Sequence, residues 1–456
     1  MRLLSLLATF IIITQCNKFY HSGGENHFTE WKHYLGDPGR SHYSKLSEFT
    51  SKNIKSLKVA WEYESKDYGQ MQMNPIVVDT LLYGVSSALR VFALDARSGE
   101  EVWVFGDTLK TLFSTSRGVS YWESGNDRRI FYTKGADLWA LNAHTGQPIL
   151  SFGKGGKIDL RSGLPASARD KFVISSTPGT IYKNLIIMPL RLSEGVGAAP
   201  GDVMAFDVIT GELAWSFHTL PRNGEPGIET WGDPNISESP IVGAANNWAG
   251  MALDQKREIL YVPTGSAAPD FYGALRPGKN LYSNCLLALN ANTGKLLWYY
   301  QFIHHDLWDR DPPAPPNLIT VKHGGKKIAA VAQVTKQGYV FVFNRETGQP
   351  LFDIKEEAVP ESELPGEQTW PTQPIPVKPA RFARQSDKLT IKDISPFAPN
   401  RDSLITLFKQ SDKRNFAPPS LKPALLLPGY DGGAEWGGAA ADPDKGILYI
   451  NSNEMA

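Results

Sequence analysis

The chain has 456 residues, with 47 Lys and Arg against 47 Asp and Glu, so its formal net charge is zero. Such a chain has no global field to recruit nucleic acid or an anionic membrane surface, and we expect neither to be bound through net charge. The content of 12 Trp, 41 Gly and 32 Pro favours many short strands joined by turns over a helical bundle. A single domain of this length requires a repeat or barrel type of fold.

The first residues, MRLLSLLATFIIITQ, combine Arg2 with an apolar run from Leu3 to Ile13. This pattern is typical of a signal peptide, because the run is too short to span a bilayer. We therefore expect a signal peptide at 1–16, a linker at 17–30 and a periplasmic protein, with a buried N-terminal strand or helix as the alternative. Cys16 stands where a lipoprotein carries its acylated cysteine, but Gln15 is not the usual small residue before it, so a lipid anchor stays open. The only other cysteine, Cys285, is expected to be a buried strand thiol.

A strand–turn–strand pattern recurs along the chain. Its copies are VFALDARSGEEVWVF (91–105), LWALNAHTGQPILSF (138–152), VMAFDVITGELAWSF (203–217), LLALNANTGKLLWYY (286–300) and VFVFNRETGQPLFDI (340–354). In each turn, Asp or Asn caps the backbone with its side chain and the glycine takes the left-handed conformation. A large apolar residue follows the glycine by four positions, and in three copies it is Trp103, Trp215 or Trp298.

Repeats longer than about 40 residues with this signature are typical of a β-propeller. We therefore predict an all-β propeller over residues 31–456; a β-sandwich with coincidental turns is the alternative. From about 353 to 427 the repeat gives way to a proline-rich stretch, expected to be a functional insertion or disordered. Trp370 and Phe382 in this stretch favour packing across the propeller face. Because the chain stops inside the strand-like text GILYINSNEMA, we expect the last blades of the ring to be missing.

The stretch IHHDLWDRDPPAPP (303–316) directly follows a predicted blade strand. Taken alone, it fits a metal cluster, a solvated loop or the rim of an active site. Neighbouring side chains of an extended chain point to opposite sides, so His304 and His305 do not easily share one metal ion. Lys336 lies in a TKQG turn between two apolar strands, where it either serves a site or simply reaches solvent.

Several segments together resemble one family. The Trp-bearing repeat, HHDLWDRD, QVTKQGYVFVFNRETG, GEQTWPTQP and GGAEWGGAA are similar to the quinoprotein dehydrogenases that use pyrroloquinoline quinone (PQQ), of the glucose, polyol and quinate branch. The resemblance runs from about Trp31 to the end of the chain, and it implies an eight-bladed propeller with the quinone at its centre. It further implies that the hydroxyl of a sugar, polyol or cyclic alcohol is oxidised by hydride transfer to the quinone, with electrons passed to ubiquinone or a cytochrome.

The resemblance also implies roles for individual residues. Asp306 matches the catalytic base, and Lys336 matches the residue that stabilises negative charge on the quinone carbonyl. Trp248 and Trp436 match the residues that stack on the quinone and close over it, with an ordinary blade tryptophan as the alternative for each. The implied partners of the quinone's carboxylates are Arg117, Ser176 and Thr177; the two hydroxyl residues could instead be ordinary strand residues.

A metal site follows from the same resemblance. Calcium or magnesium is expected, since the family's ligands are hard oxygen donors. Glu194 stands at the position of the family's Glu, Ser266 replaces the family's Asn, and Asp306 completes the set. The alternative function is a non-catalytic propeller scaffold or assembly lipoprotein. The joint presence of Asp306, Lys336, Trp248 and Arg117 favours the enzyme.

Overall fold

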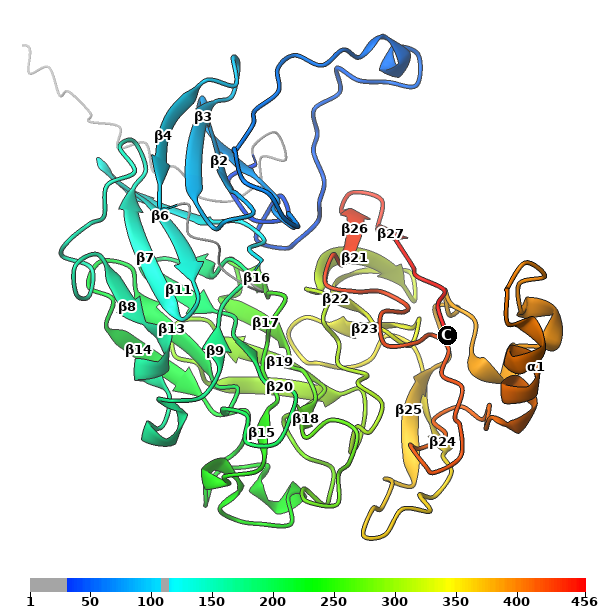
Figure 1. Ribbon diagram of the computed structural model, residues 1–456. Helices are drawn as coiled ribbons and strands as arrows, with labels where there is room; N and C mark the ends of the chain where they lie inside the picture. The colour runs from blue at the N-terminus through cyan, green and yellow to red at the C-terminus, as the bar shows by residue number, and fades with distance from the viewer. Residues whose placement is uncertain (1–30, 108–114) are drawn as a thin grey trace, which may run out of the picture.

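The computed structural model describes residues 31–107 and 115–456. The signal peptide and linker predicted for residues 1–30, Cys16 included, lie outside the described residues. In the described part, antiparallel sheets follow one another in chain order and fan around a common centre (Figure 1). No helix of the described residues is long and apolar enough to cross a membrane.

Within these residues, five sheets of three or four strands keep the strand order of the sequence. The first two hold β1 (Ile76–Val78), β2 (Leu81–Val85), β3 (Val91–Asp95) and β4 (Glu101–Phe105), then β5 (Ser120–Ser124), β6 (Asp127–Lys134), β7 (Asp137–Asn142) and β8 (Lys157–Asp159). The third and fourth hold β10 (Thr180–Tyr182), β11 (Leu185–Met188), β13 (Val203–Asp207) and β14 (Leu213–Phe217), then β16 (Ala252–Asp254), β17 (Ile259–Pro263), β19 (Cys285–Asn290) and β20 (Leu296–Gln301). The fifth holds β21 (Asn317–His323), β22 (Lys326–Val334) and β23 (Val340–Asn344).

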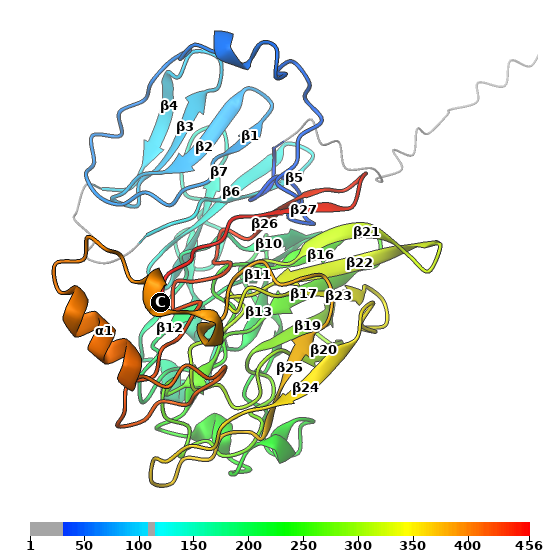
Figure 2. The ribbon, with the colours of Figure 1, turned by 90° about the vertical axis from the view of Figure 1, so that its right-hand side faces the viewer.

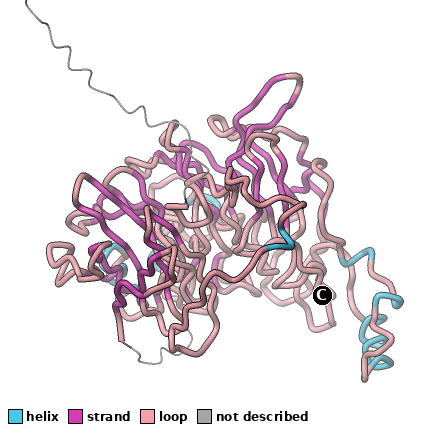
Figure 3. The backbone as a smooth tube through the Cα atoms, turned by 90° about the horizontal axis from the view of Figure 1, so that it is seen from above, coloured by secondary structure: helices cyan, strands magenta, loops and turns pink. Residues whose placement is uncertain are grey.

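Two-stranded sheets and short helices complete the described part. The strand pairs are β9 (Val173–Ile174) with β12 (Arg191–Leu192), β15 (Gly243–Ala244) with β18 (Ala267–Ala268), β24 (Ile354–Ala358) with β25 (Thr372–Pro376), and β26 (Ala439–Asp442) with β27 (Ile447–Ile450). The 3₁₀ helices are η1 (Ile54–Ser56), η2 (Leu160–Gly163), η3 (Ala166–Ala168), η4 (Ile228–Thr230), η5 (Ile236–Glu238), η6 (Ser386–Lys388) and η7 (Ile391–Asp393). The α-helix α1 (Arg401–Gln410) lies at the periphery, apart from the sheets (Figure 3).

The first strands of successive sheets lie side by side. β5 contacts β10, β10 contacts β16, β16 contacts β21, and β21 contacts β26; β26 and β27 lie close to β21 in both side views (Figures 1 and 2). These strands form the inner layer, whereas the last strands β14 and β20 carry exposed residues and lie on the outside. The predicted propeller architecture is thus confirmed, whereas the count of eight blades and the missing blades stay predictions.

A tryptophan of one sheet covers the turn glycine of the next. The ring of Trp103 lies over Gly146, where a Cβ would stand 2.5 Å from the ring, and its Nε1 donates to the carbonyl of Ala143 at 2.9 Å. Because Gly146 has φ +68° and its Cβ space is filled, only glycine fits there. The same contact joins Trp215 to Gly294 and Trp298 to Gly348. These contacts tie neighbouring sheets together and explain the repeated Gly and Trp positions.

Two of the five predicted repeats lack their second strand. After the turn glycine, the chain makes a single bridge from Leu141 to Pro148 in one copy and from Phe343 to Pro350 in the other. Both copies contain Gln-Pro at this point. Proline has no N–H to continue the ladder, so the expected outer strand does not form there.

The proline-rich stretch at 353–427 packs onto the propeller. Its hairpin β24–β25 places Ile354 and Ile375 against a core cluster that includes Phe302 and Phe341. Phe382 packs with a second cluster, and the ring of Trp370 stands edge-on to His304 at 6.1 Å. Side chains of this stretch therefore pack against the sheets, and its role as an insertion across the propeller face stays a prediction.

The segment at 31–41 joins the inner strands from the N-terminal side. Trp31 bridges to Val77 in β1, and the Arg40 guanidinium donates to Thr180 Oγ1 in β10 at 2.9 Å. Its backbone carbonyls accept three further bonds, from Leu253 N in β16 to Pro38 O (2.8 Å), from Leu318 N in β21 to Gly39 O (3.0 Å) and from Ala441 N in β26 to Ser41 O (2.7 Å). One short segment therefore contacts five inner strands.

Candidate active site

A cavity of about 390 Å³ lies where the loops that lead into the inner strands meet. Its volume is in the range of ligand pockets, which enclose about 300–1,000 Å³. Arg117, Trp248 and Trp436 stand a few residues before β5, β16 and β26, and Asp309 and Asp311 stand shortly before β21. The inner strands thus bring residues from distant parts of the sequence to one place.

Arg117 forms a buried cationic wall of this cavity. Its Nη1 donates to Ser176 Oγ at 2.9 Å and Thr177 Oγ1 at 3.1 Å, and its guanidinium carbon lies 4.5 Å from the ring centre of Trp436 and 5.2 Å from that of Trp248. Burial lowers the pKa of Arg117 to about 10. In the described part of the chain its Nε is buried without a hydrogen-bond partner, although the charge of Glu435 acts on the guanidinium. A buried guanidinium with an unused donor is unfavourable, so this wall is suited to an anion.

Lys336 is buried against acidic residues and does not reach solvent. Its Nζ lies 2.5 Å from Asp311 Oδ1, 3.1 Å from Asp309 Oδ2 and 3.9 Å from Glu435 Oε1. Burial alone would lower the pKa of Lys336, but these three carboxylates more than offset it and raise the pKa. Asp311 also accepts a 2.7 Å bond from Trp248 Nε1, so it connects the lysine to the aromatic wall.

Asp306 lies behind the cavity wall and not on it. Its Oδ2 accepts bonds from Ser266 Oγ (2.6 Å), Asn284 Nδ2 (2.8 Å) and the backbone N of Arg310 (2.7 Å), while Oδ1 accepts from the backbone N of Trp308 (2.9 Å). The residue is 1% exposed and is not among the residues that line the cavity. Four donors occupy its two oxygens, so the side chain holds its loop in place.

Asp309 lines the cavity beside Lys336. It adopts φ +53°, a left-handed conformation that turns the chain three residues after Asp306. Burial and the neighbouring Asp311 raise the pKa of Asp309 above its ordinary value, and the charge of Lys336 opposes this shift. Neither Asp309 nor Asp311 was singled out from the sequence as a site residue, so their places in the cavity are findings of the structure.

The predicted metal ligands are only partly brought together. Glu194 and Ser266 both line the cavity, and Ser266 bonds to Asp306, whereas the exposed Glu194 bonds to neither of them among the described residues. The described part holds no ready cluster of three or more His, Cys, Asp or Glu side chains for a metal ion. Burial, followed by the charges of Asp306 and Glu194, raises the pKa of Asp270 to about 8.

The donor chemistry nevertheless suits a hard cation. Six carboxylates line the cavity against two guanidinium groups, and Asp270 Oδ1 and Asn284 Oδ1 are buried without a hydrogen-bond partner. Oxygen donors of this kind bind calcium or magnesium, and a cation would relieve the repulsion among the acids. Asp270 and Asn284 were not singled out from the sequence.

A family model described as PQQ: Glucose/ethanol/alcohol dehydrogenase, beta-propeller domain, matches residues 31–456. The chain belongs to this family. Among relatives of this PQQ propeller family, quinoprotein glucose dehydrogenase of Escherichia coli is 33% identical over 92% of the chain and 55% of its own length. Quinate/shikimate dehydrogenase (quinone) of Acinetobacter baylyi is 31% identical over 93% of the chain and 56% of its own length. The resemblance inferred from the motifs is confirmed.

Solved structures agree in fold. A quinohemoprotein alcohol dehydrogenase of Pseudomonas putida superposes with a TM-score of 0.69 over 94% of this chain and 57% of its own, at 22% identity. The chain spans a little over half the length of these relatives.

Proposed function

We propose that this chain is the catalytic propeller of a PQQ-dependent dehydrogenase that oxidises the hydroxyl of a sugar, polyol or cyclic alcohol. One observation carries the proposal: a single cavity joins the buried Arg117 and its two tryptophans to the acidic wall that surrounds Lys336. A propeller scaffold has no use for a buried guanidinium whose Nε is left without a hydrogen-bond partner. Family membership and relatives that act on glucose and on quinate support the same substrate class.

The residues present fit the quinone cofactor. PQQ is planar and carries three carboxylates, and when bound it supplies a hydride acceptor. Arg117, Ser176 and Thr177 would hold carboxylate oxygens, because the guanidinium has a free Nε and the hydroxyls lie within its hydrogen-bonding reach. Trp248 and Trp436 line the same cavity and offer aromatic rings on which a planar group would stack.

We assign the proton acceptor to Asp309 in place of Asp306. Asp309 lies on the cavity wall with Lys336 beside it, whereas both oxygens of Asp306 are committed to other donors. A carboxylate with a raised pKa is a stronger base, so in its ionised form Asp309 accepts a proton from a hydroxyl more readily. The charge of the nearby Lys336 favours this ionised form. Lys336 is buried against Asp309 and Asp311 of this wall, and its positive charge would stabilise negative charge that develops on a bound quinone.

The metal ion, location and electron acceptor follow the same proposal. Calcium or magnesium would bind among the acidic residues near Asp270, where it would also lower the pKa of neighbouring carboxylates. We propose export to the periplasm on the N-terminal pattern, with ubiquinone or a cytochrome as the electron acceptor and a lipid anchor at Cys16 left open. Cell fractionation of the full chain tests the location.

Cofactor binding and dye reduction test the function. The purified chain is titrated with PQQ in the presence of calcium or magnesium and followed by quenching of tryptophan fluorescence, because Trp248 and Trp436 line the cavity. It is then given aldoses, polyols and quinate with an artificial electron acceptor. Saturable quenching and substrate-dependent dye reduction are expected. A folded chain that binds no PQQ with either metal would contradict the proposal.

A further inference from the structure

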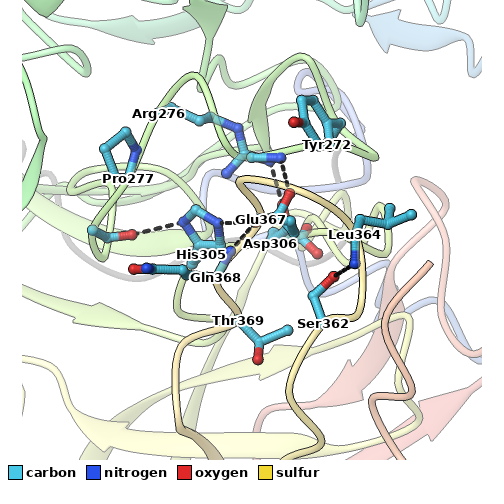
Figure 4. A network of polar contacts seen from close by, with 12 residues as sticks. Tyr272, Arg276, Pro277, His305, Asp306, Ser362, Leu364, Glu367, Gln368 and Thr369 are labelled. Carbon is cyan, nitrogen blue, oxygen red and sulfur yellow. Dashed lines mark hydrogen bonds and ion pairs between the residues drawn. The ribbon is translucent and has the colours of Figure 1, made fainter. Parts of the chain in front are cut away.

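The proline-rich insertion reaches the two loops that build the acidic side of the cavity. The loop at 269–282 carries Asp270, and the loop at 303–311 carries Asp309. Glu367, from the insertion, lies between these loops (Figure 4). Its side chain is 2% exposed, although it stands in a segment rich in exposed residues.

The carboxylate of Glu367 accepts bonds from all three segments. Oε1 lies 3.0 Å from His305 Nε2 on one loop and accepts from Gln368 N of the insertion at 2.9 Å. Oε2 accepts from Gly273 N on the other loop. Burial raises the pKa of Glu367, but the bonds from His305 and Gly273 outweigh it and lower the pKa below its ordinary value. The side chain is therefore held as a carboxylate.

His305 is held from both sides of its ring. Its Nδ1 lies 2.8 Å from the carbonyl oxygen of Gly278, which can only accept, and its Nε2 faces the Glu367 carboxylate. Contacts at both ring nitrogens therefore fix the position and orientation of the imidazole between Gly278 and Glu367. The side chains of His305 and Glu367 are both 2% exposed. Changing either residue leaves the other buried without its contact, which is destabilising.

The pair is connected directly to the reactive wall. His305 has φ +50°, an uncommon conformation for a residue with a side chain, and it precedes Asp306. Arg276, fully buried, donates to the backbone carbonyls of Asp306 and, at 3.2 Å, of Asp270. A shift of His305 or Gly273 is therefore transmitted to the positions of Asp309 and Asp270.

We propose that Glu367 is a positioning residue: from the insertion, it fixes the separation of the two loops that present Asp270 and Asp309 to the cavity. The catalytic consequence rests on the function proposed above, whereas the clamp itself does not. A second residue of the insertion, Gln373, also fixes the 303–311 loop. Its Oε1 accepts from the backbone N of His304 at 2.8 Å, and its Nε2 donates to the carbonyl of His304 at 2.7 Å.

Hydrogen exchange on the cofactor-free chain tests the clamp. Glu367→Gln keeps the size of the side chain but loses the charge and one acceptor oxygen. Backbone amides at 270–281 and 303–309 are expected to exchange about 10-fold faster in this variant. Exchange in the sheet formed by β10, β11, β13 and β14 should be unchanged. The matched control is Glu363→Gln, an acid of the same insertion whose side chain is 72% exposed. Unchanged exchange in both loops, or equal acceleration throughout the chain, would overturn the proposal.

Kinetics of the PQQ-loaded chain test the consequence. Because a displacement of about 1 Å in a catalytic group lowers rates about 100-fold, Glu367→Gln should reduce kcat by about that factor. PQQ affinity should stay within about twofold, since Arg117, Ser176 and Thr177 lie on other loops. A purely structural role would instead lower PQQ affinity and the unfolding temperature while sparing kcat, and that result would refute a positioning role.

A double variant separates the remaining outcomes. His305→Gln should reproduce the loss in kcat, and the double variant Glu367→Gln/His305→Gln should be no worse than the poorer single variant, because both act through one contact. If Glu367→Gln does not fold, His305→Gln is judged by the same exchange and kinetic criteria. Multiplying losses in the double variant would contradict the proposal. Wild-type chain that binds no PQQ refutes the proposed function, while the exchange result still decides the clamp.

Discussion

Two substitutions, Asp309→Asn and Asp306→Asn, test whether the two carboxylates of the 303–311 loop have different functions. Asp309 lines the cavity. When Asp309 is neutralised, Lys336 still has its ion pair with Asp311, whose Oδ1 lies 2.5 Å from Lys336 Nζ. The asparagine should therefore fold normally and bind PQQ. A general base contributes about 10²–10⁴ in rate, or ~3–5.5 kcal/mol of barrier, so kcat should fall by that factor.

Asp306→Asn should instead act mainly on stability. Its two oxygens accept four bonds, and an asparagine has one acceptor oxygen and an amide group that faces a donor. Losing charged, buried hydrogen bonds of this kind costs about 1.5–3 kcal/mol each, so the unfolding temperature should fall by several degrees.

The assay measures PQQ affinity, kcat with saturating cofactor and substrate, and the unfolding temperature of both variants. Expected are a slow but stable Asp309→Asn and a destabilised Asp306→Asn. If Asp309→Asn kept more than a third of the wild-type kcat while Asp306→Asn lost turnover without loss of stability, the assignment of the base to Asp309 would be wrong.

Three further predictions concern packing, pH and the cationic wall. Gly294 has φ +69° and a Cβ site 2.5 Å from the Trp215 ring, so Gly294→Ala should lower the free energy of unfolding by well over ~1–2 kcal/mol. The control Gly324→Ala, with φ +56° and open space around its Cβ site, should lower it by about 1–2 kcal/mol. Equal losses in denaturant titrations would contradict the Trp contact. Burial raises the pKa of Asp202 from 3.8 to about 6, so the folded state favours the protonated carboxyl. This preference stabilises the folded state by about 3 kcal/mol below about pH 4, and the stabilisation is lost as the pH rises through about 6. Asp202→Asn should therefore be more stable than wild type at pH 8 and not at pH 4, and a constant difference across this range would refute the reasoning. Arg117→Lys keeps the charge but loses the planar contacts with the two rings, so PQQ affinity measured by calorimetry should weaken at least 10-fold, and an unchanged value would remove Arg117 from the binding wall.

The repeat was predictable because its determinants are local. A left-handed Gly211 or Gly294 is dictated by its own turn, and the tryptophan four residues later belongs to the same strand pair. The missing outer strands after Gly146 and Gly348 were also readable in principle, since Pro148 and Pro350 remove the N–H that a ladder needs. What local pattern does not contain is the order in which sheets meet around the centre.

The cationic wall was likewise predicted, because Arg117, Ser176, Thr177, Trp248 and Trp436 stand in recognisable motifs, and the structure brings them together. The acidic wall was not. Asp306 and Asp309 are three residues apart in a loop whose turns at His305 and Asp309 adopt positive φ, so the alternation expected of an extended chain does not tell which carboxylate faces the cavity. The role of Glu367 could not be predicted from the sequence for another reason. Its partner His305 lies 62 residues earlier, and no periodic pattern connects an insertion with a blade loop.

The segment at 31–41 also has a consequence for the order of folding. Its partners lie at Val77, Leu253, Leu318 and Ala441, so its last bond spans 400 residues of sequence. During synthesis this segment leaves the ribosome before all of these partners but cannot complete its bonds until Ala441 has emerged. Contacts of such separation form slowly. Early sheets must therefore assemble without it, and its docking is expected to be the late step that makes the inner strands cooperate as one unit.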